Sequence, residues 1–165
     1  ENAMLRFETN YTVSDKLRRL LNGLNEAFTP SDQRSVLTQI GQIYLDATKK
    51  RFETQTDVDR KKWKPLRPDT IRKKGHSRIG VLSGDLRNSI KMEFTGNSVF
   101  IGTDVIYAKT FHYLVKKGSF GKGIPWGDIP RRSFIGRNNR IDDQVAKKLK
   151  QIYAKQFGLD VSSLW

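Results

Sequence analysis

The chain of 165 residues has no cysteine and only two histidines. Without thiols it cannot form disulfides, hold an iron–sulfur cluster or a cysteine zinc site, or use a thiolate nucleophile, and this composition fits a reducing compartment. It also has no run approaching the roughly 18 apolar residues that a membrane helix needs, and its first residues lack a signal-peptide pattern. We therefore expect a soluble, unprocessed protein without membrane contact, in which residues 1–3 ahead of Met4 are a cloning remnant.

Catalytic patterns are equally scarce. His76 and His112 stand 36 positions apart, and neither lies in a His-x-x-x-His or Glu-x-x-His arrangement that would place metal ligands on one helix face. His112 lies among aromatic residues, where a packed histidine is more common than a catalytic base. Residues 83–85 lack the Gly-x-Ser-x-Gly pattern of a nucleophile elbow, and residues 118–123 lack the Gly-Lys-Ser/Thr ending of a phosphate loop. We predict no enzymatic activity, no metal and no cofactor.

One acidic pair keeps an alternative open. Asp57 and Asp59 precede Arg60, Lys61 and Lys62, and two carboxylates beside a lysine can hold Mg²⁺ and stabilise phosphate charge in a nuclease. Acids next to a helix end also cap turns by accepting backbone hydrogen bonds. We favour the turn-capping interpretation, because such clusters are frequent in charged loops.

The positive charge is large and unevenly distributed. The chain has 31 basic against 17 acidic residues, a formal net charge of +14. Residues 60–78 contain nine basic residues against Asp69 alone, and residues 105–140 contain eight against Asp128 alone, whereas the rest of the chain is nearly balanced. Both segments have weak secondary-structure periodicity. Basic loops on a neutral scaffold predict a docking surface, and the alternative is a surface that serves solubility.

Apolar residues recur at three- and four-residue steps in several stretches, which predicts amphipathic helices. The expected helices cover about 13–28, 29–53 and 141–157, with short ones at 68–74 and near 105–114. The second helix begins at Thr29-Pro30-Ser31-Asp32, which offers a cap hydroxyl, a proline at the first helical position and an acid three residues after the cap. Gly158 is placed to end the last helix.

Apolar and polar side chains alternate over residues 89–103 on both sides of Gly96-Asn97, which predicts a β-hairpin with a two-residue type II′ turn. This loop length sets the register. It places Phe94 opposite Val99 and Met92 opposite Ile101 on a buried face, with Glu93 and Phe100 on the other face. Five glycines and two prolines favour a long mobile loop within residues 115–140.

These elements together predict the fold class. We expect an α+β protein in which N-terminal helices and a C-terminal helix pack on a small antiparallel hairpin-based sheet, with long basic loops. The length is sufficient for one hydrophobic core, so a single domain over residues 4–165 is expected.

Five motifs follow one another in order within about residues 36–157. They are Arg51-Phe52 with Gln55 and Asp57-x-Asp59; Trp63-x-Pro65-Leu66 with Thr70-x-x-Lys73; Leu82-x-Gly84-x-Leu86-x-x-Ser89-Ile90; Gly102-Thr103 with Tyr107-Ala108-x-x-x-His112; and Ile129-Pro130-x-Arg132-x-Phe134-Ile135-Gly136. In this order they resemble the virion morphogenesis (tail completion) family of Mu-like phages and prophages. Two features depart from that family: Arg60 stands where members often carry glycine, and the stretch from Tyr113 to Asp128 is longer than usual.

The resemblance implies a structural, non-enzymatic role in finishing the phage tail and joining it to the filled head through protein–protein contacts. Several copies would assemble as a ring that contacts phage tail or connector proteins. The protein would be found in the host bacterial cytoplasm during assembly and then in the virion tail or neck. No catalytic residue carries over from the family.

Nucleic-acid binding is the main alternative function. The basic runs interleave with Trp63, His76, Tyr113, Phe120 and Trp126, which could stack on bases while lysines and arginines contact phosphates. No helix-turn-helix or RNA-recognition signature accompanies them, so contact with DNA would be independent of its sequence.

The predicted partner-binding residues come from the two basic segments. They are Lys61, Lys62, Trp63, Lys64, Arg67, Arg72, Lys73, Lys74, Lys116, Lys117, Phe120, Lys122, Trp126, Arg131, Arg132 and Phe134. Trp63 and Phe134 have a second interpretation, because an aromatic side chain in a loop can equally anchor that loop on the protein's own core.

Overall fold

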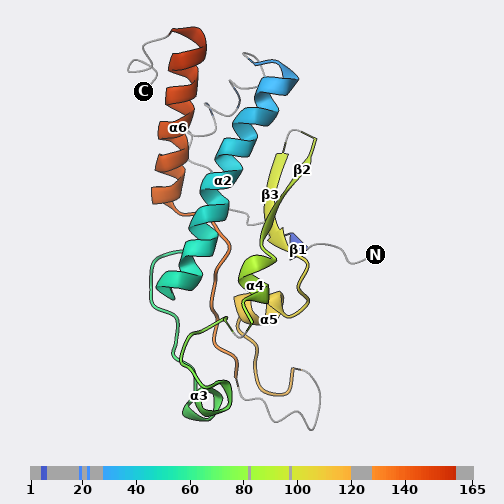
Figure 1. Ribbon diagram of the computed structural model, residues 1–165, viewed down its shortest axis with the longest axis vertical. Helices are drawn as coiled ribbons and strands as arrows, with labels where there is room; N and C mark the ends of the chain where they lie inside the picture. The colour runs from blue at the N-terminus through green and yellow to red at the C-terminus, as the bar shows by residue number, and fades with distance from the viewer. Residues whose placement is uncertain are drawn as a thin grey trace. The chain divides into compact units, whose positions relative to one another are not determined.

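The computed structural model describes residues 5–6, 19, 22, 28–81, 83–96, 98–119 and 128–158. The elements in chain order are β1 (Leu5–Arg6), α2 (Pro30–Thr54), α3 (Pro68–Lys74), α4 (Asp85–Asn88), β2 (Lys91–Thr95), β3 (Ser98–Thr103), α5 (Ala108–His112) and α6 (Asn139–Phe157) (Figure 1). Helices precede and follow a small antiparallel sheet, which confirms the predicted α+β class.

The two long helices begin and end where the sequence predicts. Thr29 caps α2, because its Oγ1 accepts from the N–H of Asp32 at 3.3 Å and donates to the Asp32 carboxylate at 2.6 Å. Asn138 caps α6 by accepting from the N–H of Ile141 at 3.0 Å, and Gly158 ends it with φ 61°. The predicted helix over 13–28 lies almost wholly outside the described residues.

The sheet contains one strand that the sequence did not predict. Its strand order is β1-β3-β2, and β1 pairs antiparallel with β3, with Leu5 opposite Thr103 and Arg6 opposite Gly102. A strand of two residues is too short to show an alternating pattern. The hairpin of β2 and β3 was predicted, although Asn97 of its turn lies outside the described residues. The predicted pairing of Phe94 with Val99 and of Met92 with Ile101 stays a prediction.

The chain divides into two compact units. Unit 1 contains residues 1–7, 48–91 and 101–136, and unit 2 contains residues 8–47, 92–100 and 137–165. The division falls within α2, which is one continuous helix. The expectation of a single domain therefore stays a prediction, and each unit is described separately below.

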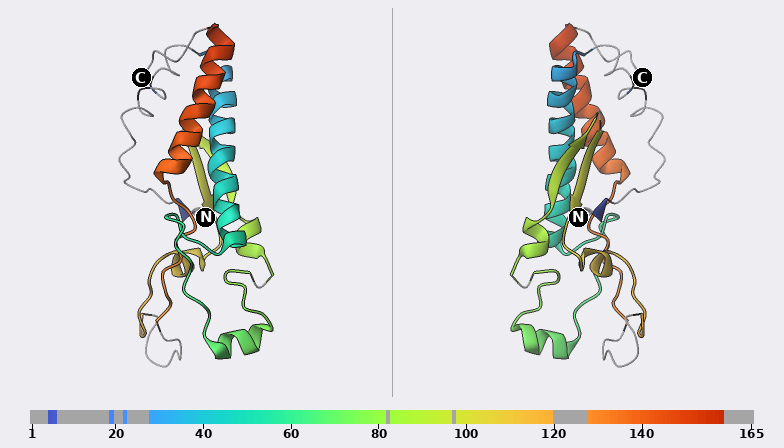
Figure 2. Two further views of the ribbon diagram at one scale, coloured as in Figure 1. Left: turned by 90° about the vertical axis from the view of Figure 1, so that its left-hand side faces the viewer. Right: turned by 90° about the vertical axis from the view of Figure 1, so that its right-hand side faces the viewer.

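Unit 2 has a hydrophobic core between the N-terminal part of α2 and α6, which lie side by side (Figures 1 and 2). The buried residues are Phe28, Val36, Ile40, Ile141, Val145, Ala146, Leu149 and Tyr153. A polar contact closes one end of this core, because the Tyr44 hydroxyl donates to Asp142 Oδ1 at 2.7 Å and Arg137 donates to the same carboxylate at 2.8 Å. Burial and the bond to Asp142 raise the pKa of Tyr44.

A glycine lets the hairpin approach α2 closely within unit 2. A Cβ at Gly41 would clash with Met92 and lie 2.9 Å from Val99. Arg34 of α2 lies over the Phe94 ring, 4.5 Å from its centroid. Met92, Phe94 and Val99 therefore face α2 together, in agreement with the face that the alternating sequence predicts.

Candidate functional site

The loops that carry most of the cations are anchored on an aromatic cluster in unit 1. The ring centroid of Phe52 in α2 lies 5.4 Å from that of Trp63 and 5.2 Å from that of Phe134. Phe111 of α5 stacks on Phe52 at 6.0 Å and meets Trp63 edge to face at 5.4 Å. Aromatic pairs in these geometries stabilise a core beyond the area that they bury. Four segments far apart in the sequence are therefore held at one point.

Arg51 ties α2 to the segment that contains Phe134. Its buried guanidinium donates to the carbonyl oxygens of Phe134 at 2.7 Å and Gly136 at 3.0 Å. Burial lowers the pKa of Arg51 to about 10, while the carboxylates of Asp57 and Asp59 act in the opposite direction. The side chain stays charged at neutral pH and makes two charge-assisted hydrogen bonds to backbone carbonyls.

Asp57 closes the turn after α2. Its Oδ1 accepts from the backbone N–H groups of Asp59 and Lys61, each at 2.9 Å, which confirms the turn-capping interpretation. Arg60 in this turn has φ 67°, a left-handed conformation that favours glycine. In the described ranges, no group of three or more His, Cys, Asp or Glu side chains is arranged to hold a metal ion.

The Gln55 side chain closes the base of the first basic segment. Its Nε2 donates to the carbonyls of Phe52 at 2.6 Å and Ile79 at 3.1 Å, and its Oε1 accepts from the N–H of Ile79 at 2.6 Å. The amide thus bonds to both backbone groups of Ile79, as a neighbouring strand would. Residues 56–78 therefore leave and return to the core at one fixed place, and α3 lies at the tip of this loop (Figure 1).

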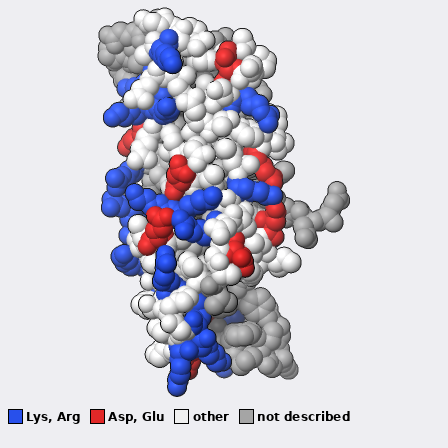
Figure 3. All heavy atoms as spheres, in the orientation of Figure 1, with Lys and Arg blue, Asp and Glu red and all other residues white. Residues whose placement is uncertain are grey.

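The cations of this loop point to solvent. No residue of α3 is buried, and Lys and Arg side chains gather over the part of unit 1 that carries it (Figure 3). The exposed members are Arg60, Lys61, Lys62, Lys64, Arg67, Arg72, Lys73 and Arg78. Lys74 is half-buried, donates to the carbonyl of Arg78 at 2.8 Å, and has its pKa lowered by burial and by Arg132. Asp69 forms an exposed ion pair with Arg72.

The second basic segment is held against the same unit. Val115 and Ile129 form an antiparallel bridge, with N–H···O distances of 3.1 and 2.8 Å. The N–H of Lys117 donates to Asp128 Oδ1 at 2.8 Å. Lys116, Lys117 and Arg131 are exposed, as predicted for a contact surface. The predicted site residues Phe120, Lys122 and Trp126, and most of the predicted mobile loop, lie outside the described residues.

Three of the predicted partner-binding side chains are buried within unit 1. Trp63 is 5% exposed, Arg132 is 6% exposed and Phe134 is 0% exposed. Arg132 donates to the carbonyl of Lys64 at 3.1 Å, and its guanidinium carbon lies 5.7 Å from the ring centroid of Phe111. These side chains fix the loops onto the core, so the exposed contact surface does not include them. Trp63 is likewise not placed to stack on a nucleic-acid base.

His112 is a packed side chain, as its aromatic surroundings predict. It is buried, and its ring centroid lies 5.2 Å from that of Phe134. Burial lowers the pKa of His112 to about 4, with further contributions from Arg131 and Arg51. The imidazole is therefore neutral at physiological pH.

The charge analysis missed an exposed apolar group around α5. Ile106 is 81% exposed, Leu114 56%, Tyr107 52% and Tyr113 49%. The signal in the sequence was two pairs of adjacent large apolar residues, at 106–107 and 113–114, on either side of the short helix. We call these four side chains the α5 surface.

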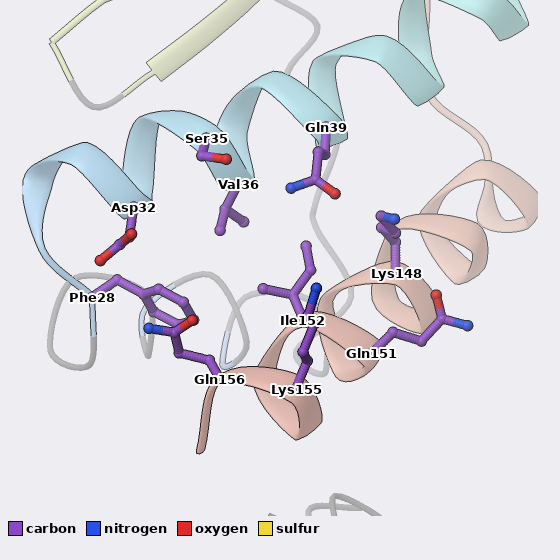
Figure 4. Close-up of a pocket in the computed structure, with 10 residues that line it drawn as sticks. All are labelled: Phe28, Asp32, Ser35, Val36, Gln39, Lys148, Gln151, Ile152, Lys155 and Gln156. Carbon is purple, nitrogen blue, oxygen red and sulfur yellow. The ribbon is translucent and has the colours of Figure 1, made fainter. Parts of the chain in front are cut away.

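Unit 2 contains a groove of about 360 Å³ between α2 and α6 (Figure 4). Its lining includes the apolar side chains of Phe28, Val36 and Ile152, and polar groups from both helices. Asp32 of this lining is engaged with the Thr29 hydroxyl that caps α2. The groove therefore shows helix-end polar groups and core side chains, and no constellation that indicates a reaction.

Comparison with known proteins identifies a family. A profile described as the phage virion morphogenesis family matches residues 12–154, a range that contains all five sequence motifs. Searches of curated proteins and of solved structures gave no match. In the part of the chain that the structure describes, no helix is long and apolar enough to cross a membrane.

Proposed function

Because the chain belongs to the phage virion morphogenesis family, we propose that it completes the phage tail and joins it to the head, acting through protein–protein contacts in an oligomeric assembly. The family supports a role in building the virion. The finer assignment to the tail and neck rests on the ordered motifs and on the exposed cations of unit 1.

The observation that carries the proposal is the separation of the basic loop from the protein's own core. α3 contributes no buried residue, yet Gln55 fixes the base of its loop through three hydrogen bonds. An exposed, cation-rich element on an anchored base has little role in folding stability and is presented to other macromolecules. Complementary charge would steer acidic partners toward it, in a manner that salt weakens.

The assembly that fits this role is a ring of several copies. Heterologous contacts between copies close into a ring when the rotation between them closes. The partners would be further copies of this chain and phage tail or connector proteins. The protein would meet them in the host bacterial cytoplasm and remain in the virion tail or neck.

Charge reversal on α3 tests the proposal. Arg72→Glu with Lys73→Glu changes two exposed cations, and Lys50→Glu with Lys147→Glu is a control with the same change in net charge outside both basic segments. Each pair is introduced into a prophage in place of the natural gene, and infectious particles are counted. We expect the α3 pair to reduce the titre by orders of magnitude and the control pair to leave it near the wild-type value. Equal titres would contradict the proposal.

Sequence-independent binding of nucleic acid is the second candidate, and the density of exposed cations over residues 61–73 favours it. Phosphate contacts make affinity fall steeply with salt concentration. Binding of the purified chain to unrelated DNA duplexes is measured over a salt series. Tight binding at physiological salt that weakens steeply as salt rises, and that is equal for duplexes of different sequence, would place this function ahead of the structural one.

A further inference from the structure

We propose that the α5 surface docks a different protein of the virion, at a site where apolar side chains are flanked by carboxylates. This inference rests on the proposed function and names the chemistry of one partner. It concerns Ile106, Tyr107, Tyr113 and Leu114, none of which lies among the cations that the sequence pointed to.

These four side chains lie close together in the chain, two before and two after the short helix α5. The N–H groups of Ala108, Phe111 and Tyr113 donate to the carbonyls of Val105, Tyr107 and Lys109 at 3.0, 3.1 and 2.9 Å. Ile106 and Tyr107 form the turn that enters α5, and Tyr113 and Leu114 follow it, with Tyr113 extended. All four are exposed, whereas Ala108 and His112 within α5 are buried.

The surface is supported from below. Phe111 packs on Phe52 and Trp63, and its carbonyl accepts from the N–H of Arg132 at 3.2 Å. A Cβ at Gly80 would lie 2.7 Å from the Phe111 ring, so the packing beneath α5 leaves no spare room. A preorganised apolar surface loses less entropy on binding than a mobile one.

The exposed hydrophobic side chains of this surface are clustered, unlike the single exposed apolar residues found on most proteins. In the described ranges, five large hydrophobic side chains are exposed, and four of them lie within residues 106–114. Single exposed apolar residues are normal on a soluble protein, whereas a contiguous group marks a contact site. Ile106 is the extreme case, because four fifths of its surface is open to water.

The charges around the α5 surface select the partner. Lys109, Lys116 and Lys117 are exposed on the same segment, and the bond from Arg132 to α5 brings the exposed Arg131 beside it. The acids nearby are Asp104, which pairs with Lys91 at 2.6 Å, Asp128, which accepts from the Lys117 backbone, and Asp85, which interacts with Tyr107. Cations outnumber acids around the α5 surface, so carboxylates on the partner would complement these cations.

Nucleic acid and a face-to-face second copy fit this surface less well. Protein–DNA interfaces are strongly polar, whereas Ile106 and Leu114 offer aliphatic groups that neither stack on bases nor bond to phosphate. Two copies meeting through this surface would bring the cations of each against those of the other. A different protein with apolar and acidic side chains avoids both difficulties.

The test uses the purified full chain and fluorescein-labelled synthetic peptides of equal length. One peptide alternates Leu with Glu, a second replaces each Leu by Ser, and a third replaces each Glu by Lys. The variant Ile106→Ser with Leu114→Ser removes the aliphatic groups, and Ile106→Leu with Leu114→Ile keeps them as a matched control. Circular dichroism establishes that both variants are folded, and fluorescence anisotropy measures binding.

We expect the Leu–Glu peptide to bind at least about tenfold more tightly than the other two. The serine variant should lose this advantage and the control variant should keep it. Equal binding of the Leu–Glu and Ser–Glu peptides, or an unchanged affinity in the serine variant, would overturn the proposal. So would sedimentation showing that wild-type chains self-associate and that the serine variant does not.

The two proposals fail separately. The α5 peptides report on the apolar surface alone, whereas the titre of the Arg72→Glu and Lys73→Glu prophage reports on the basic loop. If the peptides do not bind the α5 surface as expected but the titre falls, the assembly role stands and another surface docks the partner. A normal titre shows that the basic loop does not serve assembly, whatever the peptides show.

Discussion

The guanidinium of Arg51 donates a 2.7 Å hydrogen bond to the carbonyl oxygen of Phe134, 83 residues further along the chain. A second bond from the same group reaches Gly136. This contact joins the end of α2 to the last motif of the chain, and it explains why an arginine that precedes Phe52 is buried instead of reaching into solvent.

Replacing this side chain should cost stability. Arg51→Met removes two charge-assisted hydrogen bonds, each worth about 1.5 kcal/mol or more, so we predict a loss of about 3 kcal/mol in the free energy of unfolding. Urea denaturation followed by circular dichroism measures it. Arg78→Met changes an exposed arginine and should have little effect. A loss below about 0.5 kcal/mol for Arg51→Met would show that the contact is not structural.

Gly80 should be intolerant of a methyl group. It has φ 69°, and a Cβ there would lie 2.7 Å from Phe111 and 3.0 Å from Phe52. Gly75 has a similar φ of 75° but no atom within 4 Å of its Cβ position. Both Ala variants share the conformational strain, of about 1 kcal/mol.

We therefore predict that Gly80→Ala lowers the free energy of unfolding by about 1–3 kcal/mol more than Gly75→Ala, because it alone overpacks the cluster. Thermal denaturation of the two variants side by side gives the difference. Equal losses would show that the cluster yields without cost and is not closely packed.

Arg60 occupies a conformation that suits glycine. Its φ of 67° gives a physical reason for the glycine that members of the family often carry in this turn. Arg60→Gly relieves the strain in the folded turn but makes the unfolded chain more flexible, which lowers stability. Lys61→Gly also makes the unfolded chain more flexible but relieves no strain. We predict that the Arg60 variant is more stable than the Lys61 variant by about 1 kcal/mol. The reverse order in chemical denaturation would refute this account of the turn.

His112 makes stability depend on pH. Its folded pKa of about 4 lies below the ordinary histidine value of about 6.5, so the unfolded chain binds the proton first as the pH falls. His112 contributes on the order of 3 kcal/mol to the free energy of unfolding above about pH 6.5. This contribution is lost progressively as the pH falls toward 4.

The measurement compares the pH dependence of unfolding for the wild type and for His112→Gln. We expect the slope between about pH 5 and 6.5 to be smaller in the variant, because carboxylates contribute little in that range. An identical slope in the two proteins would show that His112 does not carry the effect.

The sequence predicted those parts of the fold that depend on local signals. Thr29 and Asn138 begin helices, Gly158 ends one, and alternating side chains define the hairpin, because each of these signals acts over a few residues. β1 was missed because two residues carry no pattern. The meeting of Phe52 with Phe134 was missed because contacts between distant segments leave no trace in a single sequence.

The candidate site shows the same limit. Exposed cations such as Lys61 and Arg72 were predicted, since a charge so dense has to face water. The burial of Trp63 and Phe134 was left open, because an aromatic side chain in a loop serves a core and an interface equally well. The α5 surface was overlooked because the search followed charge, and Ile106 and Leu114 have none.

The central claim is that exposed cations on an anchored loop bind other proteins during virion assembly. Electron microscopy of lysates from the Arg72→Glu and Lys73→Glu prophage tests it most directly, by counting heads that are joined to tails. The account predicts filled heads and separate tails for the α3 variant. It predicts joined particles at the wild-type frequency for the Lys50→Glu and Lys147→Glu control. Joined particles at the wild-type frequency in the α3 variant would contradict it.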